Sequence, residues 1–123
     1  MPLADGAEKY SIAAEAKVVV VGKLGHVKET AVVAGWRIEG TIAATKVIFG
    51  VAGDGRKMSY EFLCSCCPKA KAPSVKMMTR QEGLWFLIPK GRGWTSAGSC
   101  TDPGWRPLEE RAAFEEFYRK RGR

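Results

Sequence analysis

The sequence has little of what catalytic sites need. It contains one histidine, His26, so any Ser-His or Cys-His nucleophile pair would have to use it. The surrounding residues are those of an ordinary strand end and predict a structural role. The acids Glu39, Glu61 and Glu82 occur singly, without a partner at a spacing that would bring two carboxylates together for acid and base catalysis. We therefore expect a protein that is not an enzyme and that uses no cofactor.

Long apolar runs are also missing. No run approaches the roughly 18 residues that cross a bilayer, which predicts no transmembrane segment. The first 15 residues lack a basic start followed by an apolar stretch, so a signal peptide is not expected within these 123 residues. We expect an extracytoplasmic protein, periplasmic or secreted, if a signal peptide has been removed, and a cytoplasmic protein otherwise.

The positive charge is unevenly distributed. The net charge is +7, and residues 1–55 contribute none of it, because six Lys and Arg there face six Asp and Glu. A basic half can bind nucleic acid or acidic surfaces, but these charges are dispersed over loops and the C-terminal segment. The dispersion favours a solvated surface.

Two kinds of apolar pattern predict β-strands. Four consecutive valines within residues 17–30, "KVVVVGKLGHVKET", favour a strand, with Gly22 and Gly25 at bulges or bends. Residues 31–50, "AVVAGWRIEGTIAATKVIFG", and 57–64, "KMSYEFLC", alternate apolar and polar side chains, as half-buried strands do. Joined by turns, the three form a meander.

A hairpin and a terminal helix complete the outline. The apolar run in "GLWFLIPKGRGWTSAGS", residues 83–99, meets a Gly-rich turn and a second short strand. A polar, proline-containing connection precedes it, up to about Glu82. Residues 107–121 begin with Pro and two Glu and end in Arg and Lys, as a helix does. Residues 3–15 are Ala-rich and predict a short helix or an ordered lead-in.

Five strands in meander-plus-hairpin order are the strand set of an oligonucleotide/oligosaccharide-binding (OB) barrel. We expect a mainly β protein with one OB-like domain over residues 1–123. Its parts are a lead-in at 1–15 with a short N-terminal helix, barrel strands at 16–98, and a C-terminal helix at 107–121.

Several short sequence segments together resemble a known class of domain. "SIAAEAKVVVVGKL", then "TKVIFG", a cysteine and "EGLWFLI" are similar to small bacterial relatives of the netrin-like, tissue-inhibitor-of-metalloproteinase-like OB domains, over about residues 10–108. The resemblance implies a five-stranded OB barrel with flanking helices, usually exported and not enzymatic. Metalloproteinase inhibitors chelate the zinc of their target with an N-terminal cysteine, and this chain has none before Cys64. Protease inhibition is therefore not implied.

The four cysteines allow several roles. Cys64, Cys66 and Cys67 lie together, and Cys100 is distant. The C-x-x-C spacing suits zinc or redox chemistry, but a closed zinc site needs four ligands, and a redox pair needs a helix start. We expect no metal and favour a disulfide from the cluster to Cys100, which would stabilise the fold by about 3–4 kcal/mol. Free, buried thiols are the other alternative.

The tryptophans supply the best case for ligand binding. Trp36 and Trp85 alternate with apolar neighbours and are predicted to lie in the core. Trp94 and Trp105, beside basic residues, could instead stack bases of single-stranded nucleic acid; packing of Trp94 under the terminal helix is the structural alternative. The candidate nucleic-acid contacts are Trp94, Trp105, Arg92 and Arg106.

Three hypotheses follow. The first is a non-catalytic, exported OB domain that binds an unidentified protein or surface partner and contains a disulfide. The second is a cytosolic OB module that binds single-stranded nucleic acid. The third, less favoured, is a zinc or copper site formed by the cysteine thiolates.

Overall fold

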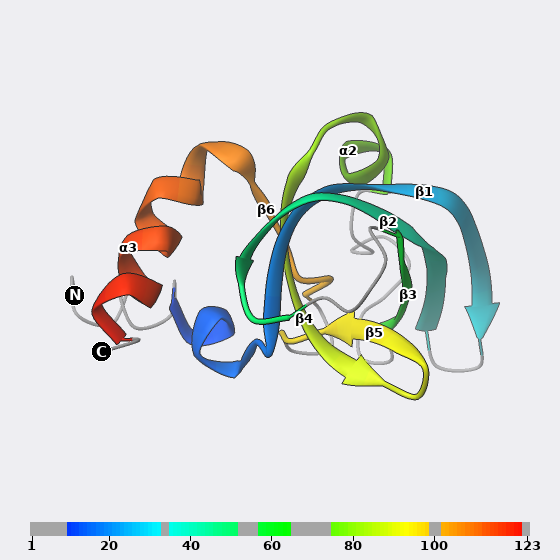
Figure 1. Ribbon diagram of the computed structural model, residues 1–123. Helices are drawn as coiled ribbons and strands as arrows, with labels where there is room; N and C mark the ends of the chain where they lie inside the picture. Colours follow the sequence, from blue (N-terminus) through cyan, green and yellow to red (C-terminus); the bar gives the residue numbers. More distant parts are fainter. Residues whose placement is uncertain (1–9, 33–34, 52–56, 65–74, 99–101, 122–123) are drawn as a thin grey trace, which may run out of the picture.

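The computed structural model describes residues 10–32, 35–51, 57–64, 75–98 and 102–121 (Figure 1). For residues 64 and 75–77 only the backbone is described. A short N-terminal helix covers residues 10–15. The elements that follow are β1 (Val18–Val32), β2 (Gly35–Phe49), β3 (Lys57–Cys64), α2 (Val75–Arg80), β4 (Gly83–Lys90), β5 (Gly93–Ser96), β6 (Trp105–Pro107), the 3-10 turn η2 (Leu108–Glu110) and α3 (Arg111–Arg121).

Five of the strands close into a barrel. Their order is β1-β2-β3-β5-β4, and a second pairing of β1 with β4 completes the ring. β3 and β5 are parallel, and the other neighbours in the ring are antiparallel. The mainly β, five-stranded OB-type barrel predicted from the sequence is confirmed, together with its short N-terminal helix and its C-terminal helix.

Residues 18–22 of β1 and 83–87 of β4 are buried on both faces, which explains the unbroken apolar runs there. Val18 pairs with Leu87 and Val20 with Trp85, and all four side chains fill the barrel interior. The alternate pairs, Val19 with Phe86 and Val21 with Leu84, point outward into a second apolar cluster. A strand that is covered on both sides needs apolar residues at every position, so alternation disappears here.

The N-terminal helix and α3 form that second cluster on the outside of the barrel. Phe114 of α3 is fully buried, with its ring centroid 4.6 Å from that of Phe86. Tyr118 is stacked on Phe49 at 4.2 Å and donates a buried hydrogen bond of 2.8 Å to the Ala13 carbonyl. Figure 1 shows both helices on the same side of the barrel. This outer layer therefore joins the two ends of the described chain.

β2 and β3 keep the alternation because their outer face has no such cover among the described residues. Their inward side chains are buried, whereas outward residues are half-buried or exposed. The inward set is Ile38, Ile42, Met58, Tyr60 and Phe62, and the outward set is Arg37, Glu39, Thr41, Ala43, Lys57, Ser59, Glu61 and Leu63. We call this outer surface of β2 and β3, with the adjoining β4–β5 hairpin, the bare face.

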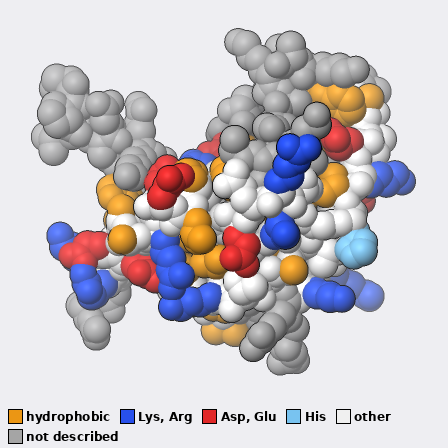
Figure 2. Space-filling view, turned by 90° about the horizontal axis from the view of Figure 1, so that it is seen from above, with side chains coloured by type: hydrophobic (Ala, Val, Ile, Leu, Met, Phe, Trp, Pro, Cys, Tyr) orange, Lys and Arg blue, Asp and Glu red, His pale blue; other side chains and the backbone are white. Residues whose placement is uncertain are grey.

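The predicted irregularities of β1 are present. The register with β2 shifts between Val21 and Gly22 and again between Gly25 and Lys28. His26 lies in the second shift with a positive φ of 53°, and its exposed side chain is visible at the surface in Figure 2. The bulge turns β1 around the barrel, and His26 has no position in the interior.

Three local expectations were wrong. The polar connection before Glu82 contains the helix α2, and its Met78 is buried in the barrel interior. β6 is a sixth short strand paired to β4, so the terminal helix starts later than residue 107, after a 3-10 turn. Trp94 packs against the interior cluster and not under α3.

No helix in the described ranges is long and apolar enough to cross a membrane.

Substitution of Phe114 by Ala tests the outer layer. Loss of this fully buried ring leaves a cavity between α3 and the barrel, and we expect a cost of about 3–5 kcal/mol in the free energy of unfolding, measured by urea denaturation. Leu108→Ala is the matched control, because Leu108 is 37% exposed, and should cost less than about 1 kcal/mol. Equal effects of the two changes would contradict a packed outer layer.

Candidate functional site

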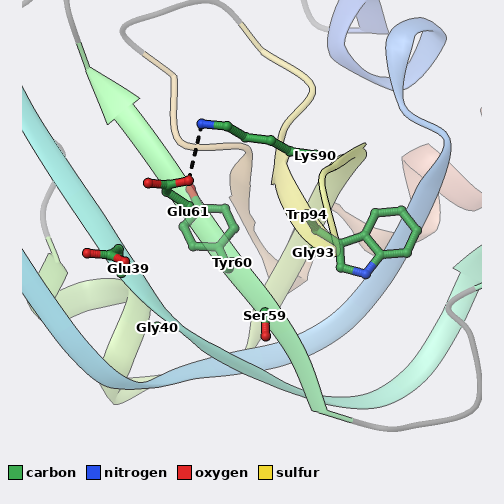
Figure 3. A pocket seen from close by; sticks show the side chains of 8 residues that line it. All are labelled: Glu39, Gly40, Ser59, Tyr60, Glu61, Lys90, Gly93 and Trp94. Atoms are coloured by element: carbon green, nitrogen blue, oxygen red, sulfur yellow. Dashed lines mark ion pairs between the residues drawn. The ribbon is translucent and has the colours of Figure 1, made fainter.

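A hollow of about 310 Å³ lies on the bare face where β2, β3 and the β4–β5 hairpin meet (Figure 3). In OB barrels the face of strands 2 and 3 and the loop between strands 4 and 5 are the usual ligand surface. The hollow is lined by Glu39, Gly40, Ser59, Tyr60, Glu61, Lys90, Gly93 and Trp94. This position makes it the candidate binding site.

The β4–β5 turn brings basic residues to the edge of the hollow. Lys90 pairs with Gly93, and the two-residue loop between them begins with Gly91 at a φ of 57°. Glycine adopts this conformation without strain, as the first central residue of a type II′ hairpin turn does. Gly93 has no side chain because a Cβ there would come within 2.8 Å of the Ser59 carbonyl oxygen. The turn thus places Lys90 and the exposed Arg92 beside β3.

Glu61 is the charged centre of the hollow. One of its carboxylate oxygens lies 3.1 Å from Arg37 Nε and the other 3.2 Å from Lys90 Nζ. All three side chains are partly exposed, with 34% of the Glu61 side chain accessible, so each ion pair adds little stability. The network instead fixes the position of the hairpin against β3.

Glu39 lies directly opposite Glu61 in the β2–β3 register. The expectation that these acids lie singly was therefore wrong. Opposite residues of an antiparallel pair have Cβ atoms about 4.5–5.5 Å apart, and like charges at such positions are unfavourable. Both strands alternate clearly in the sequence, but the register that pairs these two residues depends on the connection at 52–56, which the pattern does not specify.

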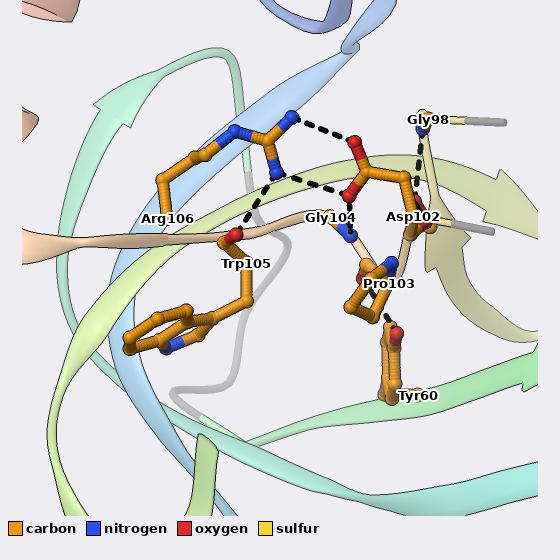
Figure 4. Close-up of polar contacts among 8 residues, drawn as sticks. Tyr60, Gly98, Asp102, Pro103, Gly104, Trp105 and Arg106 are labelled. Carbon is orange, nitrogen blue, oxygen red and sulfur yellow. Dashed lines mark hydrogen bonds and ion pairs between the residues drawn. The ribbon is translucent and has the colours of Figure 1, made fainter. Parts of the chain in front are cut away.

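Asp102 organises a second polar cluster, beside β6 (Figure 4). Its two carboxylate oxygens accept hydrogen bonds from Arg106, Nη1 at 3.0 Å and Nη2 at 2.6 Å, and one also accepts from the Gly104 N–H at 2.9 Å. Its carbonyl accepts from the Ser96 hydroxyl at 2.6 Å. The cluster therefore ties β6 to the end of β5.

The electrostatics of this cluster agree with a structural role. Burial works to raise the pKa of Asp102, but the hydrogen bonds from Arg106 and Gly104 and the guanidinium charge outweigh it and hold the pKa below its usual value. Burial, assisted by the Asp102 charge, raises the pKa of Tyr60 far above its ordinary value. Tyr60 remains protonated and donates a 2.6 Å hydrogen bond to the Pro103 carbonyl.

The four candidate nucleic-acid contacts occupy two places. Trp94 lines the hollow, and Arg92 is exposed in the adjoining turn. Trp105 packs over Gly83, where a Cβ would come within 2.4 Å of the indole Cε2, and Arg106 is bound to Asp102. The structure therefore brings Trp94 and Arg92 to the bare face and uses Trp105 and Arg106 in packing and in the Asp102 cluster.

The other residues that the sequence singled out lie either in the core or outside the described residues. Trp85 is fully buried, and its indole N–H donates a 3.0 Å hydrogen bond to the Gly22 carbonyl; Trp36 is partly buried against the same interior cluster. Cys64 ends β3, while Cys66, Cys67 and Cys100 lie outside the described residues, as does their pairing. Within the described residues, no three His, Cys, Asp or Glu side chains form a group that could hold a metal ion.

Asp102→Asn tests the second cluster through the pH dependence of stability. The folded-state pKa lies below the unfolded value of about 3.9, so the carboxylate contributes stability above that pH and loses it as the pH falls through the folded pKa. At pH 7 we expect the variant to be less stable by about 1.5–3 kcal/mol. The difference should shrink in urea melts below about pH 4. A difference independent of pH would contradict the role of the charge, and Glu109→Gln, at an exposed carboxylate, serves as the control.

Comparisons with known proteins return no relative. No family model matches the chain, and neither does any curated protein or solved structure. The site is therefore interpreted from its own geometry, and the netrin-like resemblance stays a prediction.

Proposed function

We propose that the protein is a non-catalytic, exported binding domain of the netrin-like OB class that holds a protein or surface partner on its bare face. One observation carries this proposal. The two helices cover the outer surface of β1 and β4 with apolar side chains, whereas the outer surface of β2 and β3 is left with a hollow among charged and small polar groups.

The composition of the bare face supports a binding role. The small side chains on neighbouring strands, among them Thr41, Ala43 and Ser59, project little from the sheet, so a partner can approach the strands closely. Leu63, at 39% exposure, adds an apolar contact at one end. Charged groups surround these residues, and a polar rim of this kind is typical of protein interfaces.

A non-catalytic role is supported by the way the charged groups are used. Both oxygens of Glu61 face cations, and Asp102 is fully engaged by Arg106 and Gly104. The exposed His26 lies on β1 at the bulge and is not among the residues that line the hollow. The observed contacts suit recognition and fold support more than proton transfer.

Single-stranded nucleic acid is the less well supported alternative. OB domains that bind single strands stack bases on exposed aromatic rings. The outward positions of β2 and β3 on the bare face carry no aromatic residue, because Phe49 at the end of β2 is stacked on Tyr118, and Trp94 is partly buried against the interior. Of the four predicted contacts, only Trp94 lines the hollow, and Arg92 is exposed in the turn next to it.

Tryptophan substitutions at two exposed alanine residues test the bare face. Ala43→Trp places a large ring beside the hollow, within diagonal reach of Ser59, while Ala112→Trp places the same ring on the exposed side of α3. We expect proteins retained from an extracytoplasmic extract by immobilised wild-type protein to be lost with Ala43→Trp and kept with Ala112→Trp. Quantitative mass spectrometry of the retained proteins measures the difference, and circular dichroism checks that both variants fold. Identical retention by all three proteins would reject the bare face as the binding surface.

The export component has its own test. We expect mass spectrometry of non-reduced peptides to find Cys100 joined to one cysteine of the Cys64–Cys67 cluster. Four free thiols in protein purified in air would contradict the disulfide and remove the main support for export, because disulfides persist in oxidising compartments. This result would leave the test of the bare face unaffected.

A further inference from the structure

We infer that the hollow on the bare face receives an arginine side chain from a protein partner whose surrounding surface is acidic. The inference deepens the proposed function, on which it rests, and names the chemistry of the partner. It is carried by the arrangement of charges in and around the hollow.

Hydrogen-bond acceptors dominate the interior of the hollow. Glu39 makes no hydrogen bond or ion pair within the described ranges, although it is only half-exposed. Ser59 contributes an exposed hydroxyl beside it, while Lys90, the one cation in the lining, is already paired with Glu61. A ligand group that enters the hollow is therefore favoured if it donates hydrogen bonds and carries positive charge.

The cross-strand position of Glu39 strengthens this preference. In the strand registers the carboxylate lies between Glu61 on β3 and Lys28 on β1, and it forms no ion pair in the described part of the chain. Repulsion from Glu61 opposes the attraction from Lys28. A cation that binds Glu39 directly adds the close ion pair that the free protein does not make.

Cations stand around this acidic centre. Lys28 on β1 is opposite Glu39, Lys57 is two residues from Ser59 on β3, and Arg92 is in the hairpin turn. All three are exposed, and none forms an ion pair with another described residue. The bare face thus has a negative centre and a positive surround.

This pattern distinguishes between classes of partner. A nucleic acid or another uniform polyanion would meet the cations at the rim but would bring a like charge against Glu39. A metal ion would find fewer ligands than it needs, since no group of three is present in the described ranges. A protein surface can place one cationic side chain among acidic neighbours and so match both parts of the pattern.

Arginine suits the hollow better than lysine. Its planar guanidinium can donate two parallel hydrogen bonds to the Glu39 carboxylate. Trp94 adds no stacking surface, because its indole packs against the interior cluster of the barrel.

The test uses the intact protein and a defined probe. Amide chemical shifts of labelled protein are followed during titration with the peptide acetyl-Asp-Gly-Arg-Gly-Asp-amide, in parallel with a peptide that has citrulline in place of arginine. We expect shifts around Glu39, Ser59 and Gly93 with the arginine peptide and a loss of affinity of about fivefold to tenfold with citrulline, which is the size of a typical net hydrogen-bond contribution.

Protein variants locate the effect. Glu39→Gln should lower the affinity for the arginine peptide by the same factor. Glu29→Gln should leave this affinity unchanged. Glu29 is opposite the inward residue Ile38, so it faces away from the bare face. Equal affinities for the arginine and citrulline peptides would overturn the inference. Tighter binding of a thymidine oligonucleotide at the same residues would overturn it as well.

The outcome is separable from that of the proposed function. A partner that is lost with Ala43→Trp but retained by Glu39→Gln would leave the bare face as the binding surface and reject the arginine contact. Retention of the partner by Ala43→Trp would reject the bare face, whatever the peptides do. Thermal unfolding of each variant confirms that the comparison is made on folded protein.

Discussion

The structure depends on the pairing of β1 with β4, which closes the barrel and is buried on both sides. Five consecutive pairs from Val18–Leu87 to Gly22–Gly83 join the two strands. Inward side chains fill the barrel, and outward side chains hold the N-terminal helix and α3. One short ladder therefore contributes to both apolar clusters, so the barrel and its helical cover are packed on the same two strands.

The same ladder determines which surface is available for binding. Apolar residues on the outside of β1 and β4 must be covered, and the helices that cover them occupy that side of the barrel. β2 and β3 alternate and need no cover, so small and charged residues can remain exposed there. The location of the hollow is therefore a consequence of how the apolar residues are distributed between the two halves of the barrel.

The periodicity of the sequence predicts where the strands lie, but it does not predict the registers in which they pair. The valine run and the alternation of residues 57–64 were enough to predict β1 and β3, and the Gly-rich turn was enough to predict the β4–β5 hairpin. α2 was missed because six residues are too few for a helical period to stand out beside Pro and Lys. β6 was missed because three residues show no alternation at all.

Only part of the candidate site could be predicted from the sequence, because the rest of it also depends on strand register. Trp94 and Arg92 were identified from the association of aromatic and basic residues, but Trp105 and Arg106 show the same association and serve packing and the Asp102 cluster. Glu39 and Glu61 are 22 residues apart in the numbering and become neighbours only through the strand register. Local composition cannot distinguish these cases, since each depends on contacts between distant strands.

The contact between Tyr118 and Ala13 has a consequence for how the chain reaches its native state. The two residues are separated by 105 positions, and the hydrogen bond between them belongs to the layer that covers β1 and β4. During synthesis the N-terminal helix is made well before its packing partner on α3, which follows it by about a hundred residues. The outward faces of β1 and β4 therefore stay open until α3 has been synthesised, and until then their apolar side chains are exposed to aggregation.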